Sequence, residues 1–136
     1  MGAKMKLGVI GNPIEHSKSP EIHTNFANQF DFDLVFDKYL VKKDECLEWV
    51  KSFFGSGGHG LSVTLPLKEA VLEVADDISL RAKQAAAANM LFLKNNKIFA
   101  DNTDGIGLTT DLKTKGIGIA DKKILILGAG GAAKGI

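Results

Sequence analysis

The sequence is poor in several features that mark specialised classes of protein. Cys46 is the only cysteine among 136 residues, so no disulfide can form within the chain, which is typical of a reducing compartment. No apolar run reaches the roughly 20 residues of a transmembrane helix, and the N-terminus lacks the apolar core of a signal peptide. Basic and acidic residues nearly balance, 17 against 16, without a basic stripe or an acidic tail. We therefore expect a cytoplasmic protein that binds neither membranes nor nucleic acid.

Spacings typical of metal ligands are also missing. His16 and His23 would share a helix face only if a helix began before Pro20, and no cluster of Cys, His and Asp has ligand spacing. We therefore expect no metal site. What the chain does contain is an ordinary globular composition, with 45% hydrophobic and 24% charged residues, which supports a core of the size of one domain. Cys46 is expected to lie in this core, on a helix.

Short apolar runs alternate with amphipathic patterns along the chain. The predicted strands are residues 7–10, 34–40, 61–63, 90–93, 98–100 and 123–127. The first predicted helix has Ser19 as its cap and Pro20 at its first position, and further helices are predicted at 44–54, 67–74, 80–88 and 102–114. Asn95 and Asn96 form a tight turn that adds one antiparallel pair. The alternation predicts an α/β protein, with three layers (α/β/α) around a mostly parallel sheet.

The segment Gly60–Lys68, GLSVTLPLK, carries the first chemical signal. An apolar strand leads into Thr64, Pro66 suits the start of a helix, and Lys68 then falls in the first helical turn. A cation there opposes the helix dipole, at a cost of up to about 1 kcal/mol, and this favours an amine that gives up its proton. The segment therefore predicts either a proton-accepting lysine or a solvated surface lysine whose stem bends away from the helix.

A glycine-rich segment near the end of the chain, GAGGAA, follows a predicted strand and opens a predicted helix. This context fits a dinucleotide-binding loop, in which the backbone approaches a pyrophosphate. The residues of that candidate site are Gly128, Ala129, Gly130, Gly131 and Ala132. The alternative is a glycine-rich turn without a ligand. Because a complete unit needs about 30 residues and the sequence ends one turn into the helix, we do not expect this chain alone to build a working dinucleotide site.

Three further segments hold candidate ligands. Ser17 and Ser19 lie at the mouth of a predicted helix, where hydroxyls and free N–H groups suit a carboxylate, although Ser19 can equally be a simple cap. Asp104, in the sequence DNTDG, is placed either to stabilise a helix start by about 0.5 kcal/mol or to hold a substrate hydroxyl and pair with a nearby lysine. Asn89 either ends a helix or points into a cleft.

Four of these segments, in the same order and spacing, resemble the shikimate dehydrogenase family. They are Gly11–His23, Gly60–Lys68, Asp101–Gly107 and Leu127–Ala133. The resemblance implies an NADP-dependent oxidoreductase of aromatic amino-acid (chorismate) biosynthesis that interconverts 3-dehydroshikimate and shikimate. Residues 5–101 would be its substrate-binding catalytic domain, and residues 102–136 a linker helix with the first strand and glycine loop of a Rossmann domain. Packing of one chain against another, as in a homodimer, is one of three ways to order the apolar residues 124–127; domain swapping and a longer protein are the others.

The resemblance also implies roles for individual residues. Lys68 and Asp104 would move the proton while hydride passes to or from nicotinamide. The implied substrate ligands are Ser17 and Ser19 for the carboxylate, Thr64 and Asn89 for hydroxyls, and Ser62. The implied cofactor ligands are the glycine-loop residues 128–132.

Two departures from the family pattern lie in these motifs. Ser62 stands where the family usually has Asn, and Met90 where it has Thr, so we expect weaker binding or altered substrate preference. Side chains beyond Ile136 would decide between NADP and NAD, so an NAD-using quinate/shikimate dehydrogenase stays open. A non-catalytic module that binds a small polyhydroxylated carboxylic acid is the alternative from another class.

Overall fold

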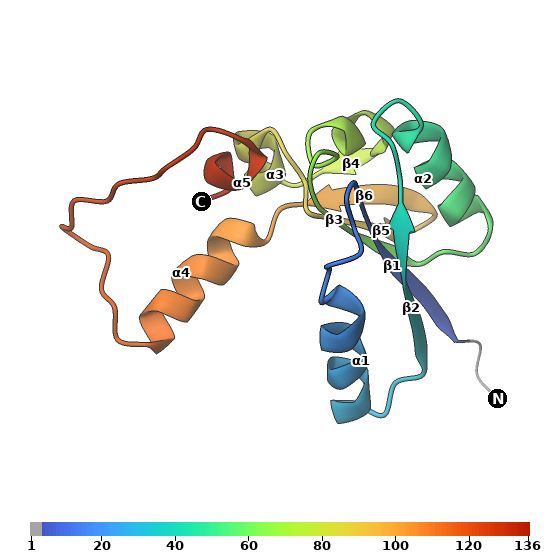
Figure 1. Ribbon diagram of the computed structural model, residues 1–136, viewed down its shortest axis with the longest axis horizontal. Helices are drawn as coiled ribbons and strands as arrows, with labels where there is room; N and C mark the ends of the chain where they lie inside the picture. The colour runs from blue at the N-terminus through green and yellow to red at the C-terminus, as the bar shows by residue number, and fades with distance from the viewer. Residues whose placement is uncertain (1–3) are drawn as a thin grey trace.

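The computed structural model describes residues 4–136 (Figure 1). Its strands are β1 (Met5–Gly11), β2 (Leu34–Leu40), β3 (Gly60–Val63), β4 (Asp77–Ile78), β5 (Met90–Lys94) and β6 (Lys97–Asp101). Its helices are α1 (Ser19–Gln29), α2 (Cys46–Gly55), the 3₁₀ helix η1 (Ala70–Val74), α3 (Leu80–Ala85), α4 (Asp104–Thr114) and α5 (Gly131–Lys134). The alternation of strands and helices confirms the predicted α/β class.

All six strands form one sheet, in the order β2-β1-β3-β5-β6-β4. Its parallel pairs are β1·β2, β1·β3 and β4·β6. Only β5 runs against its neighbours, so there are two antiparallel pairs, β3·β5 and β5·β6, where the sequence predicted one. The predicted turn between β5 and β6 is confirmed, because Asn95 and Asn96 adopt positive φ angles of 53° and 60°, as a tight hairpin requires.

The helices before β2 and β3 lie on opposite faces of the sheet. The crossover through α1 leads from β1 to β2, and the crossover through α2 leads back past β1 to β3; right-handed connections in opposite directions place their helices on opposite faces. The core lies on the α2 side, where Cys46 and Val50 of α2 pack with Val71 of η1 and with Leu61 and other strand residues. The prediction of a core thiol at position 46 is confirmed.

Beyond β6 the chain leaves the sheet. After α4 it runs through an irregular segment and returns to α5, which packs beside α3 (Figure 1). The predicted strand at 123–127 is wrong, since these residues form no strand and are exposed, Leu125 by 83% and Leu127 by 87%. No strand of the described sheet lies next to this segment, and an extended segment without a partner has no ladder of hydrogen bonds to hold it.

Smaller differences concern helix ends. The predicted helix at 67–74 is replaced by turns and the short η1, and α3 ends at Ala85, three residues earlier than predicted, because Ala86 adopts the left-handed conformation with φ 49°. The helix after DNTDG is confirmed as α4. Within residues 4–136, none of the helices combines the length and the apolar character required to cross a bilayer.

Candidate active site

A polar pocket of about 390 Å³ lies at one edge of the sheet. The chain reaches this edge just after β1, β3 and β6 and just before β5, and the carboxyl ends of parallel strands are where α/β folds place ligands. Every residue that the sequence analysis named as catalytic or substrate-binding lines this one pocket: Ser17, Ser19, Ser62, Thr64, Lys68, Asn89 and Asp104. Segments that are up to 87 residues apart in the sequence therefore meet around a single cavity.

The shortest contact in the pocket joins Lys68 to Asp104. Lys68 Nζ lies 2.6 Å from Asp104 Oδ2, and the two side chains are only 17% and 29% exposed. Asp104 is the first residue of α4, so the positive end of that helix stabilises its carboxylate, as predicted. The backbone carbonyl of Lys68 accepts a hydrogen bond of 2.7 Å from Ala88 N, which ties the lysine segment to the start of β5. A short, partly buried ion pair of this kind is a charge-assisted hydrogen bond.

The environment of Lys68 differs from the prediction in one respect. No α-helix begins at Pro66; residues 65–69 form turns, and η1 begins only at Ala70. The helix dipole expected to act on Lys68 is therefore absent, and the partner of the ammonium is the Asp104 carboxylate. In place of a helix from Pro66, the chain makes a tight turn in which Leu67 N donates to Thr64 O, followed by a single helical hydrogen bond from Val71 N to Leu67 O.

Asn89 orients the carboxylate of Asp104. Its Nδ2 donates to Asp104 Oδ1 and to Thr103 Oγ1, each at 2.9 Å, and its Oδ1 accepts from Thr103 N at 2.9 Å. Both N–H groups of the amide are thus used within the protein, and its oxygen accepts a second, longer bond from Thr103 Oγ1 at 3.3 Å. Asn89 lines the pocket and directs its amide at the start of α4. The alternative that Asn89 ends a helix is wrong, because α3 ends at Ala85.

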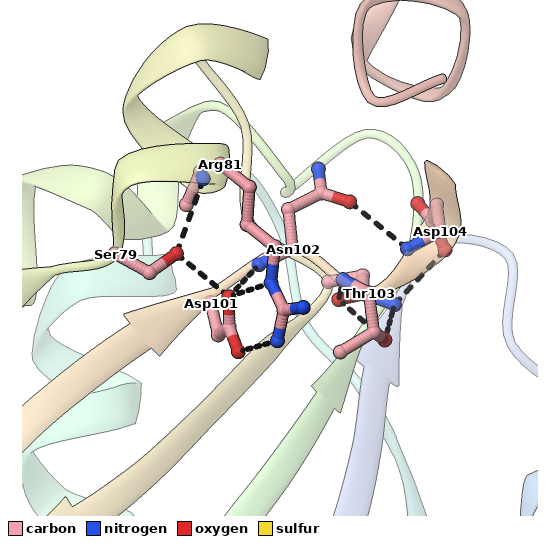
Figure 2. A network of polar contacts seen from close by, with 8 residues as sticks. Ser79, Arg81, Asp101, Asn102, Thr103 and Asp104 are labelled. Carbon is pink, nitrogen blue, oxygen red and sulfur yellow. Dashed lines mark hydrogen bonds and ion pairs between the residues drawn. The ribbon is translucent and has the colours of Figure 1, made fainter. Parts of the chain in front are cut away.

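Below the start of α4 lies a second network, which the sequence analysis missed (Figure 2). Its centre is Asp101, whose carboxylate accepts from Arg81 Nε at 2.7 Å and Arg81 Nη2, from Ser79 Oγ at 2.6 Å and from Asn102 N at 2.7 Å. The Arg81 guanidinium, with smaller help from Ser79 and the Asn102 amide, lowers the pKa of Asp101 to about 2 against desolvation. Arg81 is the only arginine in the chain. This was the one feature of the sequence that could have drawn attention to the network.

Ser17 and Ser19 come from another part of the pocket lining: Ser17 lies in the loop before α1, and Ser19 is the first residue of α1. The helix begins at Ser19 with Lys18 as its cap residue, so the prediction that Ser19 caps is wrong by one position. Ser17 Oγ accepts from Ser19 N at 3.3 Å and satisfies one of the free N–H groups there. The side chains of His16 and Lys18 line the same pocket, and the sequence analysis did not name them as ligands although they flank Ser17.

The two departures from the family pattern are direct neighbours. Ser62 on β3 is the register partner of Met90 on β5. Both line an adjacent apolar pocket of about 420 Å³ beside His23 and Phe36, and Ser62 lines the polar pocket as well. We place the chemistry in the polar pocket although it is slightly smaller, because it holds the Lys68–Asp104 pair and the apolar one contains no ion pair of the described residues.

A third pocket, of about 300 Å³, lies between Lys68 and the glycine loop. Gly130, Gly131 and Ala132 line it, whereas Gly128 and Ala129, predicted for the same role, do not. Gly128 has a φ of 123°, which glycine adopts without strain, and a Cβ on Gly128 or Gly130 would meet nothing within 4 Å. Lys68 therefore faces the polar pocket on one side and the glycine loop on the other.

Two close approaches hold the glycine-loop helix α5 in place. A Cβ on Gly131 would lie 3.1 Å from Ala87 Cβ and 3.6 Å from Lys68 Cβ, and a Cβ on Gly105 would lie 1.9 Å from the carbonyl oxygen of Gly135. Since neither pair leaves room for a side chain, Gly131 acts here as a packing residue of α5 as well as a candidate cofactor ligand. Around the described residues, no group of three His, Cys, Asp or Glu side chains is placed to hold a metal ion.

The mixed sheet, the strand-end pocket and the adjoining glycine loop define an α/β substrate-binding domain joined to the start of a glycine-loop unit. Residues 9–91 match the family described as the shikimate dehydrogenase substrate binding domain. The chain therefore belongs to the shikimate dehydrogenase family, and the resemblance seen in the sequence is confirmed.

Relatives and solved structures agree with this membership. The chain is 50% identical over 133 residues to the NADP(+) shikimate dehydrogenase of Methylococcus capsulatus, covering 96% of this chain and 48% of that protein. The shikimate dehydrogenase structure from Aquifex aeolicus superposes with a TM-score of 0.93 at 31% identity, covering 100% and 52%. The Thermus thermophilus enzyme in complex with NADP(H) and shikimate gives 0.91 at 30%, covering 97% and 50%. The chain thus spans about half the length of the relatives it matches.

Proposed function

We propose that this chain is the substrate-binding and proton-transferring part of an NADP-dependent shikimate dehydrogenase, an oxidoreductase that interconverts 3-dehydroshikimate and shikimate. The observation that carries the proposal is the contact of 2.6 Å between Lys68 Nζ and Asp104 Oδ2 in a pocket that the other predicted ligands also line. The names of the relatives, and the neighbour solved with NADP(H) and shikimate, support this choice of substrate and cofactor.

The pair is suited to moving one proton. Oxidation of a secondary alcohol removes hydride from carbon and a proton from oxygen, and NADP, when bound, supplies the hydride acceptor. In our proposal the neutral amine of Lys68 takes the hydroxyl proton, and Asp104 holds the lysine in place and stabilises the ammonium that forms. In the reverse direction the ammonium returns the proton to the carbonyl oxygen.

The remaining pocket residues would hold the substrate. The hydroxyls of Ser17 and Ser19 can donate to a carboxylate, and both residues line the same cavity as Lys68. Thr64 suits a ring hydroxyl, and Asn89 would contact another in place of its longer bond from Thr103 Oγ1. Ser62 offers one hydroxyl where the family pattern has an amide, so we propose that this position alters substrate preference.

The glycine loop fits part of the cofactor. Gly128, Ala129 and Gly130 would present backbone N–H groups to its phosphates, since the open space at the two glycines leaves room for close approach. Gly131 and Ala132 would line the side toward Lys68. The segment 123–127 contributes no strand to a nucleotide-binding sheet, so we expect the 136-residue chain by itself to hold NADP weakly.

A second candidate is binding of shikimate without turnover by this chain alone. It is favoured by the contrast between the substrate pocket, which residues between 9 and 104 line, and the segment before the glycine loop, which forms no strand. An assay of NADPH oxidation with 3-dehydroshikimate, run on the full-length natural protein, separates the two. NADH in place of NADPH, and quinate with NADP⁺ or NAD⁺ in the oxidative direction, are the controls for cofactor and substrate choice.

We expect turnover from the full-length protein, and binding of shikimate without turnover from the 136-residue chain, followed by NMR. Binding without turnover in the full-length protein would favour the non-catalytic module. If the full-length protein neither binds shikimate nor turns over 3-dehydroshikimate, both candidates are contradicted.

We further infer that the protein works in the cytoplasm and forms a homodimer. The single, fully buried thiol of Cys46 suits a reducing compartment. Large apolar side chains are exposed on and after α1, among them Phe26 by 53% and Phe30 by 76%, and these support an association surface. The solution mass of the full-length protein tests the homodimer, and a strictly monomeric mass would exclude it.

A further inference from the structure

The only arginine of the chain does not touch the substrate pocket, yet it is among the most firmly bound side chains near it. Arg81, in the first turn of α3, donates to both oxygens of Asp101, and Ser79 Oγ adds a third bond at 2.6 Å. A planar guanidinium can donate two parallel hydrogen bonds to one carboxylate in this bidentate geometry, and an ammonium cannot. The side chain of Asp101 is only 11% exposed, whereas the outer part of Arg81 reaches solvent, with 44% of its side chain exposed.

From Asp101 the contacts continue into the start of α4 (Figure 2). Asn102 N donates to Asp101 Oδ1 at 2.7 Å. The side chain of Asn102, which is 2% exposed, then donates to Ala87 O at 2.9 Å and accepts from Asp104 N at 3.0 Å. These bonds fix the backbone on both sides of Thr103 and so set the direction in which α4 leaves the sheet.

The position of the α4 start decides where the Asp104 carboxylate points. Its two oxygens have different partners: Oδ1 accepts from Asn89 Nδ2 at 2.9 Å, and Oδ2 accepts from Lys68 Nζ at 2.6 Å. A small rotation of the helix start would break one of these bonds. Uninterrupted hydrogen bonds thus lead from Arg81 through Asp101 and Asn102 to the Lys68–Asp104 pair.

We propose that Arg81 is a positioning residue that, through Asp101 and Asn102, holds the Asp104 carboxylate in the geometry in which it serves Lys68. This inference rests on the proposed dehydrogenase function. Arg81 and Asp101 do not line the pocket, so any effect on the chemistry passes through their neighbours. Asp101 O also accepts from Asn89 N at 3.0 Å, and Asn89 Nδ2 donates to Asp104 Oδ1, so this second route ends at the same carboxylate. A purely structural clamp between α3 and β6 is the competing explanation, and it would change stability without changing the turnover of the folded protein.

A double-mutant cycle in the full-length natural protein separates the two explanations. We expect Arg81→Gln to lower kcat by about 10- to 100-fold while the KM for shikimate changes by less than about threefold, as misplacement of a catalytic group does. In an Asp104→Asn background the same substitution should cost little more, because its route of action is already lost. Equal losses in both backgrounds, or an unchanged kcat in folded Arg81→Gln, would overturn the proposal.

Two further variants serve as a conservative substitution and as a matched control. Arg81→Lys keeps the charge and is the variant to use if Arg81→Gln does not fold; it should still lose kcat, because it cannot bond both oxygens of Asp101. Lys83→Gln removes a cation from the same helix, where the side chain is exposed and forms no ion pair with any described residue, and should keep full activity. A fully active Arg81→Lys would contradict the role of the bidentate contact between Arg81 and Asp101.

A spectroscopic measurement keeps the test independent of turnover. In ¹⁵N-labelled protein, Arg81→Lys should shift the amide resonances of Asn102 and Asp104, and Lys83→Gln should leave them in place. If the unmodified protein has no dehydrogenase activity, the proposed function fails while this measurement still decides whether Arg81 positions Asp104. Unmoved resonances at both residues would reject the positioning role even in an active enzyme.

Discussion

Two regions of the molecule differ in how their side chains are held. They are the pocket region, residues 60–105, and the C-terminal segment, residues 115–136. In the pocket region, the nearly buried Asp101 and Asn102 use their side-chain oxygen and nitrogen atoms in hydrogen bonds. In the C-terminal segment, Leu125 and Leu127 are almost fully exposed, and the position of α5 depends on glycine contacts and on one exposed ion pair. The residues of the candidate substrate pocket are therefore held by many hydrogen bonds, whereas the glycine loop and α5 are held by few contacts.

The largest effect is expected from a substitution in the pocket region. Lys68→Ala should lower kcat of the full-length protein by about 10²- to 10⁴-fold, because the hydroxyl proton then has no acceptor, while shikimate binding is largely kept. Steady-state kinetics with a separate shikimate titration measure both quantities. Lys51→Ala is the matched control, since Lys51 is exposed on α2 and should leave kcat unchanged. Unchanged turnover in Lys68→Ala would remove Lys68 as the proton carrier.

The same contrast explains what the sequence could predict. Periodicity and turn chemistry were sufficient for the strands β1 to β3 and the hairpin, because their apolar faces and the Asn95–Asn96 turn are local signals. The candidate pocket could be foreseen from motif resemblance, and the fold brings all of its predicted residues together. The Arg81–Asp101 network could not be foreseen, because a pair 20 residues apart meets only once α3 and β6 are in place.

Two predicted elements do not form: the helix from Pro66 and the strand at 123–127. In place of the helix expected from Pro66, the chain makes a tight turn at Thr64–Leu67, and the 3₁₀ helix η1 begins only at Ala70. The strand expected at 123–127 had the right composition but no neighbouring strand, and composition alone does not supply the hydrogen-bond partners of a sheet.

The contact between the two regions can be broken at one position. A Cβ at Gly105 would lie 1.9 Å from Gly135 O, so Gly105→Ala must push α5 away from α4, at about 1–3 kcal/mol. We expect the KM for NADP(H) to rise and the KM for shikimate to stay. Gly107→Ala on the same helix meets nothing within 4 Å and should stabilise by about 0.5–1 kcal/mol. Kinetics and urea unfolding of both variants measure the difference; identical behaviour would show that α5 does not rest on Gly105.

Acid should weaken the pocket region through Asp101. Its pKa falls from 3.8 to about 2 on folding, so the folded form binds fewer protons than the unfolded form between these values. The stabilisation is therefore present above about pH 4 and is lost as the pH falls through 2; at about 1.4 kcal/mol per pKa unit it amounts to about 2 kcal/mol. Urea unfolding between pH 5 and 2 should show this loss in the unmodified protein and not in Asp101→Asn.

A matched carboxylate distinguishes this effect from a general loss of charge. Asp111 pairs with Lys115 at 2.7 Å, but both side chains are more than half exposed, so Asp111→Asn should change the free energy of unfolding by less than about 1 kcal/mol at any pH. An equal pH response of Asp101→Asn and Asp111→Asn would show that the Arg81–Asp101 network adds no specific stability.

The smallest effect is expected in the C-terminal segment itself. Leu125 is 83% exposed and has no strand to support, so Leu125→Ser should change the free energy of unfolding by less than about 0.5 kcal/mol. Leu91→Ala is the contrasting variant, because Leu91 is fully buried in β5 and its truncation should cost about 2–5 kcal/mol. Urea unfolding of the 136-residue chain measures both. A large loss for Leu125→Ser would mean that the segment is covered by a neighbouring copy of the chain in solution, and its effect should then depend on protein concentration.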